Sequence, residues 1–292
     1  MIIVKLQGGL GNQMFQYAAG KALAMHYGVT LRLDHHFLEH PPETPGLVIR
    51  KYDLDIFRLQ VAKASDALFK NIFQPKDFKK LFFDRLGLAK QYQIIQEAHP
   101  AFNETLFQKN GFLYLDGYWQ SPHYFSAIQT VLRRDFTFLH PLLPVSQNLH
   151  TQIKLENAVC LNVRRTDFVN NPFHPLCTLN YYLQGMEAIK QKIANPHFFI
   201  FSDDKEWCHT QFGSMPDCTI VGTVHNGEKY ANQLRLMASC RHFIIPNSSF
   251  GWWAVWLANQ PDALVIAPER WTSDTKTDPS DLIEKHWIQI PN

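Results

Sequence analysis

The second half of the sequence predicts an α/β fold in which helices cover both faces of a parallel β-sheet. The first observation is a regular alternation of short apolar stretches with longer helical ones from about residue 157 onward. The second is that polar residues follow several of these apolar stretches, where parallel strands place ligand-binding groups. The third is the N-terminus, where an apolar stretch runs into a glycine-rich turn and a helical stretch. Such alternation is typical of parallel sheets.

The length and composition fit a globular protein with two domains. The chain has 292 residues, of which 46% are hydrophobic and 18% charged, so it has ample material for a core. We expect one domain over residues 1–145 and a second over 146–292, with a linker at 141–144. The net charge of +2 gives no reason to expect nucleic acid as a partner.

The cysteines and the apolar stretches bear on the compartment. Five cysteines, none in C-x-x-C spacing, argue against a disulfide framework or a zinc site and suit a reducing compartment. The N-terminus lacks the pattern of a signal peptide. The longest apolar region, 243–258, is interrupted by Pro246 and the polar residues after it. The sequence therefore predicts a cytoplasmic protein without a transmembrane segment, and peripheral attachment to a membrane stays open.

The first half of the chain begins with a strand, a turn and a helix. The expected elements are, in chain order, a buried strand at 1–6, a glycine-rich turn at 8–13, a helix at 14–27, a strand at 30–33, helical periodicity over 62–110 and a strand at 113–120. At the end of the last strand, Tyr118 and Trp119 either stack on a sugar or belong to the core.

The glycine-rich turn is a candidate ligand-binding segment. A strand, a glycine turn and a helix in succession are typical of a backbone-amide cradle for an anion or a sugar. Gly9 and Gly11 supply the close backbone, and the side-chain amides of Asn12 and Gln13 can address hydroxyl groups. A purely structural tight turn is the alternative. Met14 stands where a dinucleotide fingerprint needs its third glycine, which weakens a nicotinamide-binding interpretation.

The second half continues with strands and helices in alternation. The expected strands lie at 158–163, 197–201, 218–222, 242–246 and 263–267, and the expected helices at 181–193, 205–212, 228–239 and 250–259. Three polar groups follow these strands and should meet at one edge of the sheet. They are Asn162, Arg164 and Arg165; Ser202, Asp203 and Asp204; and Asn247, Ser248 and Ser249.

Together the three groups predict a nucleotide site. Paired arginines can neutralise a diphosphate, because a guanidinium group binds phosphate through two parallel hydrogen bonds. Ser248 and Ser249 begin a helix whose N–H groups can hold a phosphate. A carboxylate from Asp203 or Asp204 can accept from the two adjacent N–H groups of guanine. Structural helix caps are the alternative for the serines and aspartates, and no P-loop motif is present.

Motifs spread over nearly the whole chain resemble those of one enzyme family. They are Gly8-Gly-Leu-Gly-Asn-Gln-Met-Phe-Gln-Tyr17, Tyr52-x-Leu-x-x-Phe57, Tyr118-Trp-Gln-Ser121, Arg164-Arg-Thr-Asp167, Phe201-Ser-Asp-Asp204 and Asn247-Ser-Ser-Phe-Gly-Trp-Trp-Ala254. In this order they are similar to the motifs of the α-1,2-fucosyltransferase family, the inverting, GDP-fucose-dependent glycosyltransferase family 11.

The resemblance implies a GT-B-like fold, with two Rossmann-like domains facing a cleft. It implies transfer of L-fucose from GDP-L-fucose to the 2-hydroxyl of a terminal β-galactose, with inversion and without a divalent metal or cofactor. The partners would be GDP-fucose and a galactose-terminated glycan. The first domain would serve the acceptor and the second would bind GDP-fucose. The D-x-D tripeptide at Asp53 and Asp55, a metal-binding pattern in many glycosyltransferases, is accordingly discounted.

The resemblance also suggests roles for residues. Arg164 would contact the GDP phosphates, and Arg165 would support the strand tip or the second phosphate. The other residues of the GDP site would be Asn162, Ser202, Asp203, Asp204, Asn247, Ser248, Ser249 and Phe250, with Gly9, Gly11, Asn12 and Gln13 facing the donor from the first domain.

Two departures leave the catalytic base open. Asn162 stands where the family usually has histidine, and Thr166 where glycine is common; asparagine cannot titrate near neutrality. Asp167 is a candidate catalytic residue, although holding Arg165 is the alternative role for it. His174 is another candidate, and a phosphate oxygen could accept the proton instead. A nicotinamide-dependent oxidoreductase and a non-catalytic carbohydrate-binding protein are the rival functions, which GDP binding would distinguish.

Overall fold

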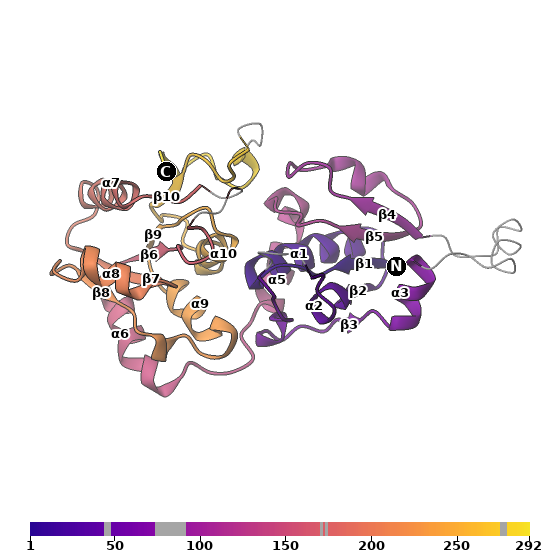
Figure 1. Ribbon diagram of the computed structural model, residues 1–292, viewed down its shortest axis with the longest axis horizontal. Coiled ribbons are helices and arrows are strands. Elements are labelled where there is room, and N and C mark those ends of the chain that lie inside the picture. Colours follow the sequence, from indigo (N-terminus) through magenta and orange to yellow (C-terminus); the bar gives the residue numbers. More distant parts are fainter. Residues whose placement is uncertain (44–47, 74–91, 170–171, 173–174, 275–278) are drawn as a thin grey trace, which may run out of the picture. The chain divides into compact units, whose positions relative to one another are not determined.

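The computed structural model describes the chain except residues 44–47, 74–91, 170–171, 173–174 and 275–278 (Figure 1). It divides into two compact units, Met1–Thr137 and Phe138–Asn292. This division lies earlier in the chain than the expected one after residue 145. The reason is that residues 138–145 pack on the second unit: the guanidinium of Arg235 lies 4.5 Å from the ring centre of Phe138 and donates a hydrogen bond to the carbonyl of His140 at 2.6 Å.

The first unit contains a five-stranded sheet in which every pairing is parallel (Figure 1). Its strand order is β3-β2-β1-β5-β4. The first three strands thus extend from β1 to one side of the sheet, and β4 and β5 lie on the other side of β1. The strands are β1 (Ile2–Lys5), β2 (Leu31–Asp34), β3 (Ala62–Lys63), β4 (Tyr92–Gln96) and β5 (Phe112–Asp116). The described helices are α1 (Leu10–His26), α2 (His36–Glu39), α3 (Asp66–Phe73) and α5 (Gln129–Asp135).

Helix α1 begins earlier than the sequence predicted. Gly9 is its N-cap, so Gly11 and Asn12 lie within its first turn rather than in a preceding loop. Glycine residues weaken an isolated helix, and α1 contains two of them. Most of α1 is buried, and this packing stabilises the helix. Gly20 is needed in mid-helix because a Cβ there would overlap the side chain of Val4 on β1.

The prediction of helical periodicity over 62–110 is wrong for most of the described residues. Only α3 is an α-helix, and Tyr92–Gln96 is a strand paired in register with β5. Residues 74–91 lie outside the described residues. This strand is at the edge of the sheet and half-exposed on both faces, so its sequence has no clean alternation of apolar and polar residues.

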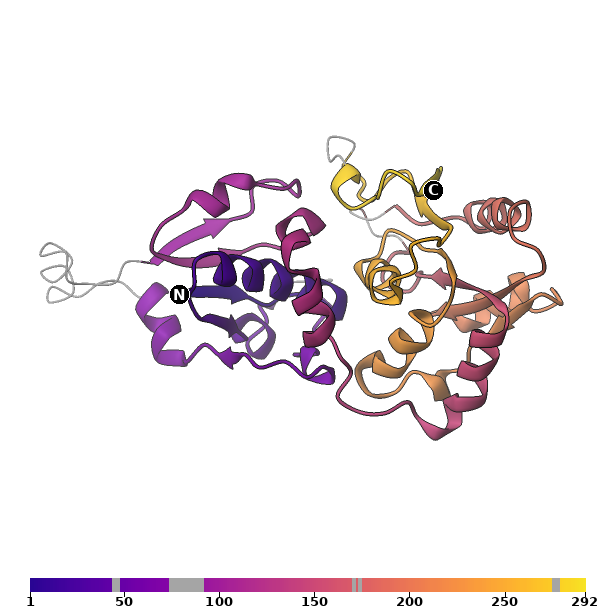
Figure 2. The same ribbon diagram turned by 180° about the vertical axis from the view of Figure 1, so that it is seen from behind.

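The second unit contains a six-stranded parallel sheet with the order β11-β10-β9-β6-β7-β8 (Figures 1 and 2). Its strands are β6 (Asn157–Val163), β7 (Pro196–Ser202), β8 (Cys218–Ile220), β9 (His242–Ile244), β10 (Val265–Pro268) and β11 (Ile288–Ile290). Its described helices are α6 (Gln147–Leu155), α7 (Leu179–Lys190), α8 (Lys205–Phe212), α9 (Ala231–Met237) and α10 (Ser249–Ala258).

The two faces of this sheet are covered by different helices. Residues of α7 and α8 form one buried core with alternate residues of β6 and β7, among them Leu161 and Ile200. On the other face α10 packs against Ile245, since a Cβ on Gly251 would lie 3.4 Å from the Cβ of Ile245. The predicted parallel sheet with helices on both faces is therefore confirmed. The strand β11 was not predicted.

The order of the six strands fixes where a ligand can bind. The chain runs outward from β6 through β7 to β8, then returns to the other side of β6 and continues from β9 to β11. The connections that leave β6 and β9 therefore run to opposite sides, and the carboxyl ends of these two strands are where a ligand is expected to bind. Among the helices that the structure describes, none has the length and apolarity needed to cross a membrane.

Candidate functional site

Arg164 is the first residue beyond β6, at the carboxyl edge of the sheet. Its guanidinium donates to the Asp167 carboxylate at 2.6 Å and lies 3.1 Å from that of Asp203. The side chain keeps 27% of its exposure. Two carboxylates therefore fix the position of a partly exposed cation. Asp167 was expected to help hold Arg165; in the structure its carboxylate bonds Arg164, whereas the carboxylate of Asp204 bonds Arg165.

Arg165 has a different environment. Its Nε donates to the Asp204 carboxylate at 3.1 Å, and its guanidinium lies 4.2 Å from the ring centre of Trp207. An arginine that pairs with a carboxylate and stacks on an indole is held rigidly. Arg165 thus fastens the tip of β6 to α8, which is the strand-tip support expected of it. Trp207 has no signal in the sequence that would have identified it as the partner.

Asp203 fixes the backbone of the segment after β6. One carboxylate oxygen accepts from the backbone N–H of Arg165 at 2.9 Å, and the other accepts from the N–H of Thr166 at 3.2 Å and from its hydroxyl. Asp204 caps α8 by accepting from the N–H of Trp207 at 3.1 Å. Ser202 is buried and accepts from the N–H of Asp204. Both aspartates thus already accept hydrogen bonds from the protein, and their role toward guanine stays a prediction.

Asn162 lies beneath this edge, with only 5% of its surface exposed. Its Nδ2 donates to the carbonyl of Phe201 on β7 at 3.1 Å. Its Oδ1 is so near α10 that a Cβ on Gly251 would lie 2.7 Å from it. At the position where the resemblance expects histidine, this chain therefore has a buried amide that joins β6, β7 and the first turn of α10.

The third polar group begins α10. Asn247 is 2% exposed, and its Nδ2 donates to the carbonyl of Trp271 at 2.9 Å, which fixes the turn after β9. Ser248 is the N-cap of α10, and Ser248, Ser249 and Phe250 are all partly exposed. The positive end of this helix dipole is therefore at the same sheet edge as the two arginines. His174 lies outside the described residues.

The glycine turn of the first unit is held by buried amides. Gly8 has φ +74°, and the Oδ1 of Asn12 accepts from the Nε2 of Gln120 at 2.8 Å. Gln13 is fully buried; its Nε2 donates to the carbonyls of Gly8 at 3.0 Å and Lys51 at 2.8 Å. The Gln13 amide consequently joins the turn to residues 51–53. Gly9, Gly11 and Asn12 remain the predicted ligand-facing members of this turn.

The aromatic end of β5 has one exposed ring and one buried ring. Trp119 is 1% exposed with φ 56°, whereas Tyr118 is 43% exposed. The Glu97 carboxylate accepts from both of their backbone N–H groups, at 2.6 and 2.9 Å, and burial raises the pKa of Glu97. Of the two rings, only that of Tyr118 is accessible to a sugar. Glu97 was not predicted, because it lies in the region assigned to a helix.

A model of the family described as glycosyl transferase family 11 matches residues 58–291. The chain belongs to this family. It is 30% identical to an α-1,2-colitosyltransferase of Escherichia coli over 99% of both chains, and 28% identical to the O-antigen biosynthesis glycosyltransferase WbnK of the same organism over 98% and 99%. It is 24% identical to a galactoside 2-α-L-fucosyltransferase of Caenorhabditis elegans, over 87% of this chain and 68% of that one. The protein is a glycosyltransferase of the fucosyltransferase type.

Solved structures support the fold of this family 11 member. The crystal structure of the NodZ α-1,6-fucosyltransferase soaked with GDP-fucose matches with a TM-score of 0.53 at 15% identity, over 95% of this chain and 96% of that one. The apo form of POFUT1 matches with a TM-score of 0.50 at 11% identity, over 91% and 97%. The predicted GT-B-like fold, built of two Rossmann-like units, is therefore confirmed.

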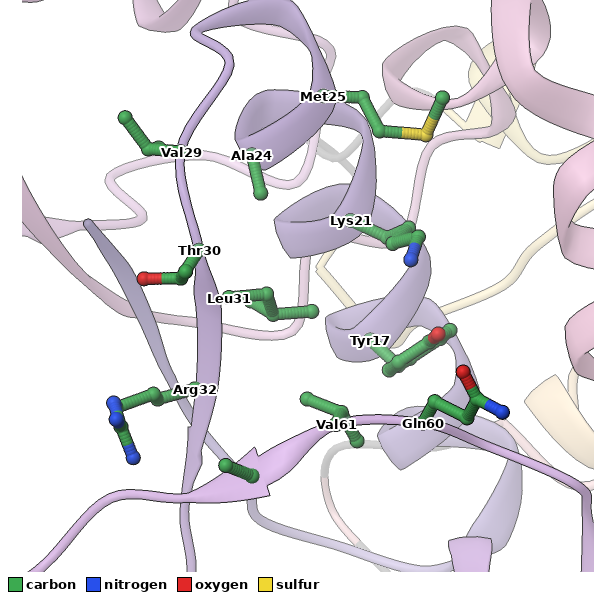
Figure 3. Close-up of a pocket in the computed structure, with 11 residues that line it drawn as sticks. Tyr17, Lys21, Ala24, Met25, Val29, Thr30, Leu31, Arg32, Gln60 and Val61 are labelled. Carbon is green, nitrogen blue, oxygen red and sulfur yellow. The ribbon is translucent and has the colours of Figure 1, made fainter.

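Two cavities of this family 11 protein lie away from the carboxyl edges. One of about 350 Å³ is between α1 and the residues that enter β2 and β3, and its lining includes Lys21 and Leu31 (Figure 3). Another of about 470 Å³ is at the amino ends of β6 and β7, beside Glu156 and His197. Both are at the opposite end of the strands from Arg164 and the glycine turn, so neither belongs to the candidate site.

The side chains available to a metal are scattered in the described part of the chain. No three His, Cys, Asp or Glu residues gather there into a metal-binding group. Asp53 precedes a short 3₁₀ turn that contains Asp55, and the backbone N–H of Asp53 donates to the side-chain oxygen of Gln13 at 2.9 Å. The five cysteines are free thiols. Metal independence stays a prediction.

Proposed function

We propose that this protein transfers L-fucose from GDP-L-fucose to the 2-hydroxyl of a terminal β-galactose, with inversion and without a metal or cofactor. The observation that carries the proposal is the placement of Arg164 at the carboxyl end of β6, beside the point where the strand order reverses. A cation held there by two carboxylates suits the diphosphate of a nucleotide sugar. Membership of the family supplies the reaction class.

The leaving group is GDP. As the bond between fucose C1 and the β-phosphate oxygen breaks, its electrons remain on the phosphate, and Arg164 with the start of α10 stabilises the growing negative charge. The galactose 2-oxygen forms the new bond to C1 from the opposite face and loses its proton. Asp203 and Asp204 act as positioning residues, because they fix the arginines before the donor arrives.

The proton of the 2-hydroxyl has no assigned acceptor among the described residues of the second unit. Asn162 cannot serve, and the Asp167 carboxylate already accepts from Arg164. A loose, oxocarbenium-like transition state allows an oxygen of the departing phosphate to take the proton. The pH profile of turnover would then show no essential protein base near neutrality.

We assign the donor to the second unit and the acceptor to the first. In the first unit, the glycine turn after β1 and the exposed Tyr118 after β5 offer uncharged polar and aromatic groups at the carboxyl edge. Such groups suit a galactose-terminated glycan. The compartment that we propose is the cytoplasm, where a nucleotide-sugar donor would be encountered.

One relative favours a second donor. The Escherichia coli protein that is 30% identical over nearly the whole chain is named for colitose, which is fucose without its 3-hydroxyl. The two donors share GDP and differ at one hydroxyl group, so the same Arg164 site serves both. A site that hydrogen-bonds the 3-hydroxyl strongly prefers fucose, because the missing hydroxyl leaves its polar groups unpaired.

The experiment incubates the full chain with GDP-fucose or GDP-colitose and with lactose or N-acetyllactosamine, each with and without EDTA. Product linkage and anomeric configuration are read by NMR. We expect an α-1,2-linked product whose rate is unaffected by EDTA. Transfer to another hydroxyl would overturn the acceptor assignment, and absence of transfer from either donor would overturn the reaction. A preference for GDP-colitose would change the sugar and leave the mechanism standing.

A further inference from the structure

The segment after β8 ends in two consecutive residues with left-handed backbone. Lys229 has φ 50° and ψ 30°, and Tyr230 has φ 60° and ψ 18°. Positive φ is uncommon outside glycine and costly for bulky side chains, so two such residues in succession persist only where the surroundings enforce them.

Asn232, two residues after Tyr230, holds this segment in place. It is 6% exposed, and its Nδ2 donates at 2.8 Å both to the hydroxyl of Ser146 and to the carbonyl of His225. Its Oδ1 accepts from the backbone N–H of Leu143 at 3.0 Å, and its own N–H donates to the carbonyl of Asn226 at 3.1 Å. The segment is thereby pinned to the start of the unit and to α9, and the two left-handed residues are its rigid joint.

The joint presents an aromatic ring at the carboxyl edge of the sheet. Tyr230 is 52% exposed, and its ring centre is 6.5 Å from that of Phe250 at an angle of 78°. The two meet because α9 carries the chain from β8 back to β9, so that α9 and α10 both begin at this edge and lie side by side (Figures 1 and 2). The backbone that carries this exposed ring is therefore held by hydrogen bonds, and the ring itself packs against Phe250.

We propose that Tyr230, with Phe250 beside it, forms the stacking surface for the purine base of the donor nucleotide. The inference rests on the proposed function and deepens it by naming a base-binding residue. Every nucleobase has a π-face that stacks on an aromatic side chain, and a ring fixed beforehand loses little freedom on binding. Phe250 lies in the first turn of α10, the helix that follows β9, so the platform adjoins the place assigned to the phosphates.

The alternative is that the two rings only pack α9 against α10. Tyr230→Gly separates the two roles, because glycine adopts positive φ without strain and removes the ring. Tyr230→Phe keeps the ring and removes the hydroxyl. Val224→Ala, at a residue 58% exposed in the same segment, is the matched control.

The experiment measures, by isothermal titration of the full chain, the Kd of GDP and of inorganic pyrophosphate, which lacks a base. We expect Tyr230→Gly to weaken GDP binding about 10- to 100-fold, the range typical of a lost aromatic stack. Its pyrophosphate affinity and its unfolding temperature should stay near those of the wild type. Val224→Ala should bind both ligands as the wild type does, and Tyr230→Phe, which restores the ring, should recover the GDP affinity that Tyr230→Gly loses.

Each other outcome overturns the proposal in a distinct way. If Tyr230→Gly binds GDP within twofold of the wild type, the rings serve only helix packing. If pyrophosphate weakens as much as GDP, the tyrosine acts by holding the segment and not by stacking. ADP and UDP are titrated in parallel, and if the wild type binds no nucleotide, the proposed function fails along with the base site. If the wild type prefers UDP to both GDP and ADP, the site does not select a purine and the proposal is overturned.

Discussion

In both units the strand order reverses within a parallel sheet, but the charged side chains at the carboxyl edge are paired differently. In the first unit, Lys5 at the end of β1 and Asp116 at the end of β5 form an ion pair at 2.8 Å across the place where the strand order reverses. In the second unit, Arg164 is paired sideways, with Asp167 in its own segment and Asp203 beyond β7. The carboxyl edge of the first sheet is bridged by its own charges, and that of the second keeps a partly exposed cation.

The difference indicates which unit suits an anion. In the first unit the glycine turn is held by uncharged amides such as Gln13, which are already hydrogen-bonded to the protein. In the second unit, the carboxylates of Asp167 and Asp203 accept hydrogen bonds that orient the Arg164 guanidinium and the backbone beside it. A charge that is already oriented before the ligand binds need not reorganise during the reaction, and it therefore stabilises the charge of the transition state more strongly.

The largest effect is expected from Arg164→Ala. Removing a preorganised donor to a leaving phosphate costs about 3–4 kcal/mol, so turnover should fall about 10²- to 10³-fold. Arg165→Ala is the control, since Arg165 bonds Asp204 and stacks on Trp207; we expect it to lower stability more than turnover. Steady-state kinetics and urea unfolding separate the two. If Arg164→Ala kept more than about a third of the wild-type rate, Arg164 would not be the group that stabilises the departing phosphate.

The next effect tests the glycine turn of the first unit. Gly8→Ala should lower the free energy of unfolding by about 2–3 kcal/mol, because its φ is +74° and a Cβ would overlap the Asn12 side chain. Gly28→Ala should cost only about 1 kcal/mol, since Gly28 has φ +63° and open space around its Cβ. Equal losses in urea unfolding would show that Asn12 moves aside without cost and that the turn is looser than described.

A smaller effect is expected from Asp167→Asn. The carboxylate lies 2.6 Å from a nitrogen of Arg164, and replacing it with a neutral amide leaves the site more positive. GDP should bind a few-fold more tightly, while turnover falls because Arg164 is less firmly oriented. Titration with GDP and steady-state kinetics measure the two effects. Weaker GDP binding in this variant would mean that Asp167 contacts the ligand directly.

The smallest effect is a difference in pH dependence. Burial and Arg241 lower the pKa of His242, whose Nδ1 accepts from the N–H of Leu264 at 3.0 Å. Its contribution to stability is present above the unfolded value of 6.5 and is lost as the pH falls through the lower folded pKa. The pKa of Glu97 in the first unit is raised by burial, so its contribution is present in acid and lost as the pH rises through that folded value.

Tryptophan fluorescence separates the units in this test, because of the seven tryptophans only Trp119 lies in the first unit. Between pH 7 and pH 5, the free energy of unfolding in urea, followed by fluorescence, should fall less steeply in His242→Asn than in the wild type. An unchanged slope would show that other groups govern the acid response of the second unit.

The sequence predicted the second unit better than the first, for physical reasons. Its central strands are buried on both faces, and a continuous apolar run such as that of β6 is a strong signal. The edge strands β4 and β11 have no such run, so one was assigned to a helix and the other was missed. Helix α8 was predicted with its observed bounds, although its cap is Asp204 and not the expected Ser202 and Asp203.

Within the site, residue types were predictable and pairings were not. The arginines, aspartates and serines after the strands were identified from their positions alone. Which carboxylate meets which arginine depends on side-chain rotamers and on Trp207, and neither is encoded locally. Tyr230 was not identified because residues 228–239 were predicted as one helix; that prediction is wrong at 228–230, where Lys229 and Tyr230 are left-handed and α9 begins only at Ala231.

Asn162 and Gly251 lie so close together that substitutions at these two positions depend on each other. Because a Cβ at 251 would lie 2.7 Å from the Asn162 oxygen and 3.4 Å from Ile245, residue 251 can gain a side chain only if Asn162 shifts. Engineering of this part of the scaffold, including the introduction of a titratable group at 162, therefore calls for joint selection at 162, 245 and 251.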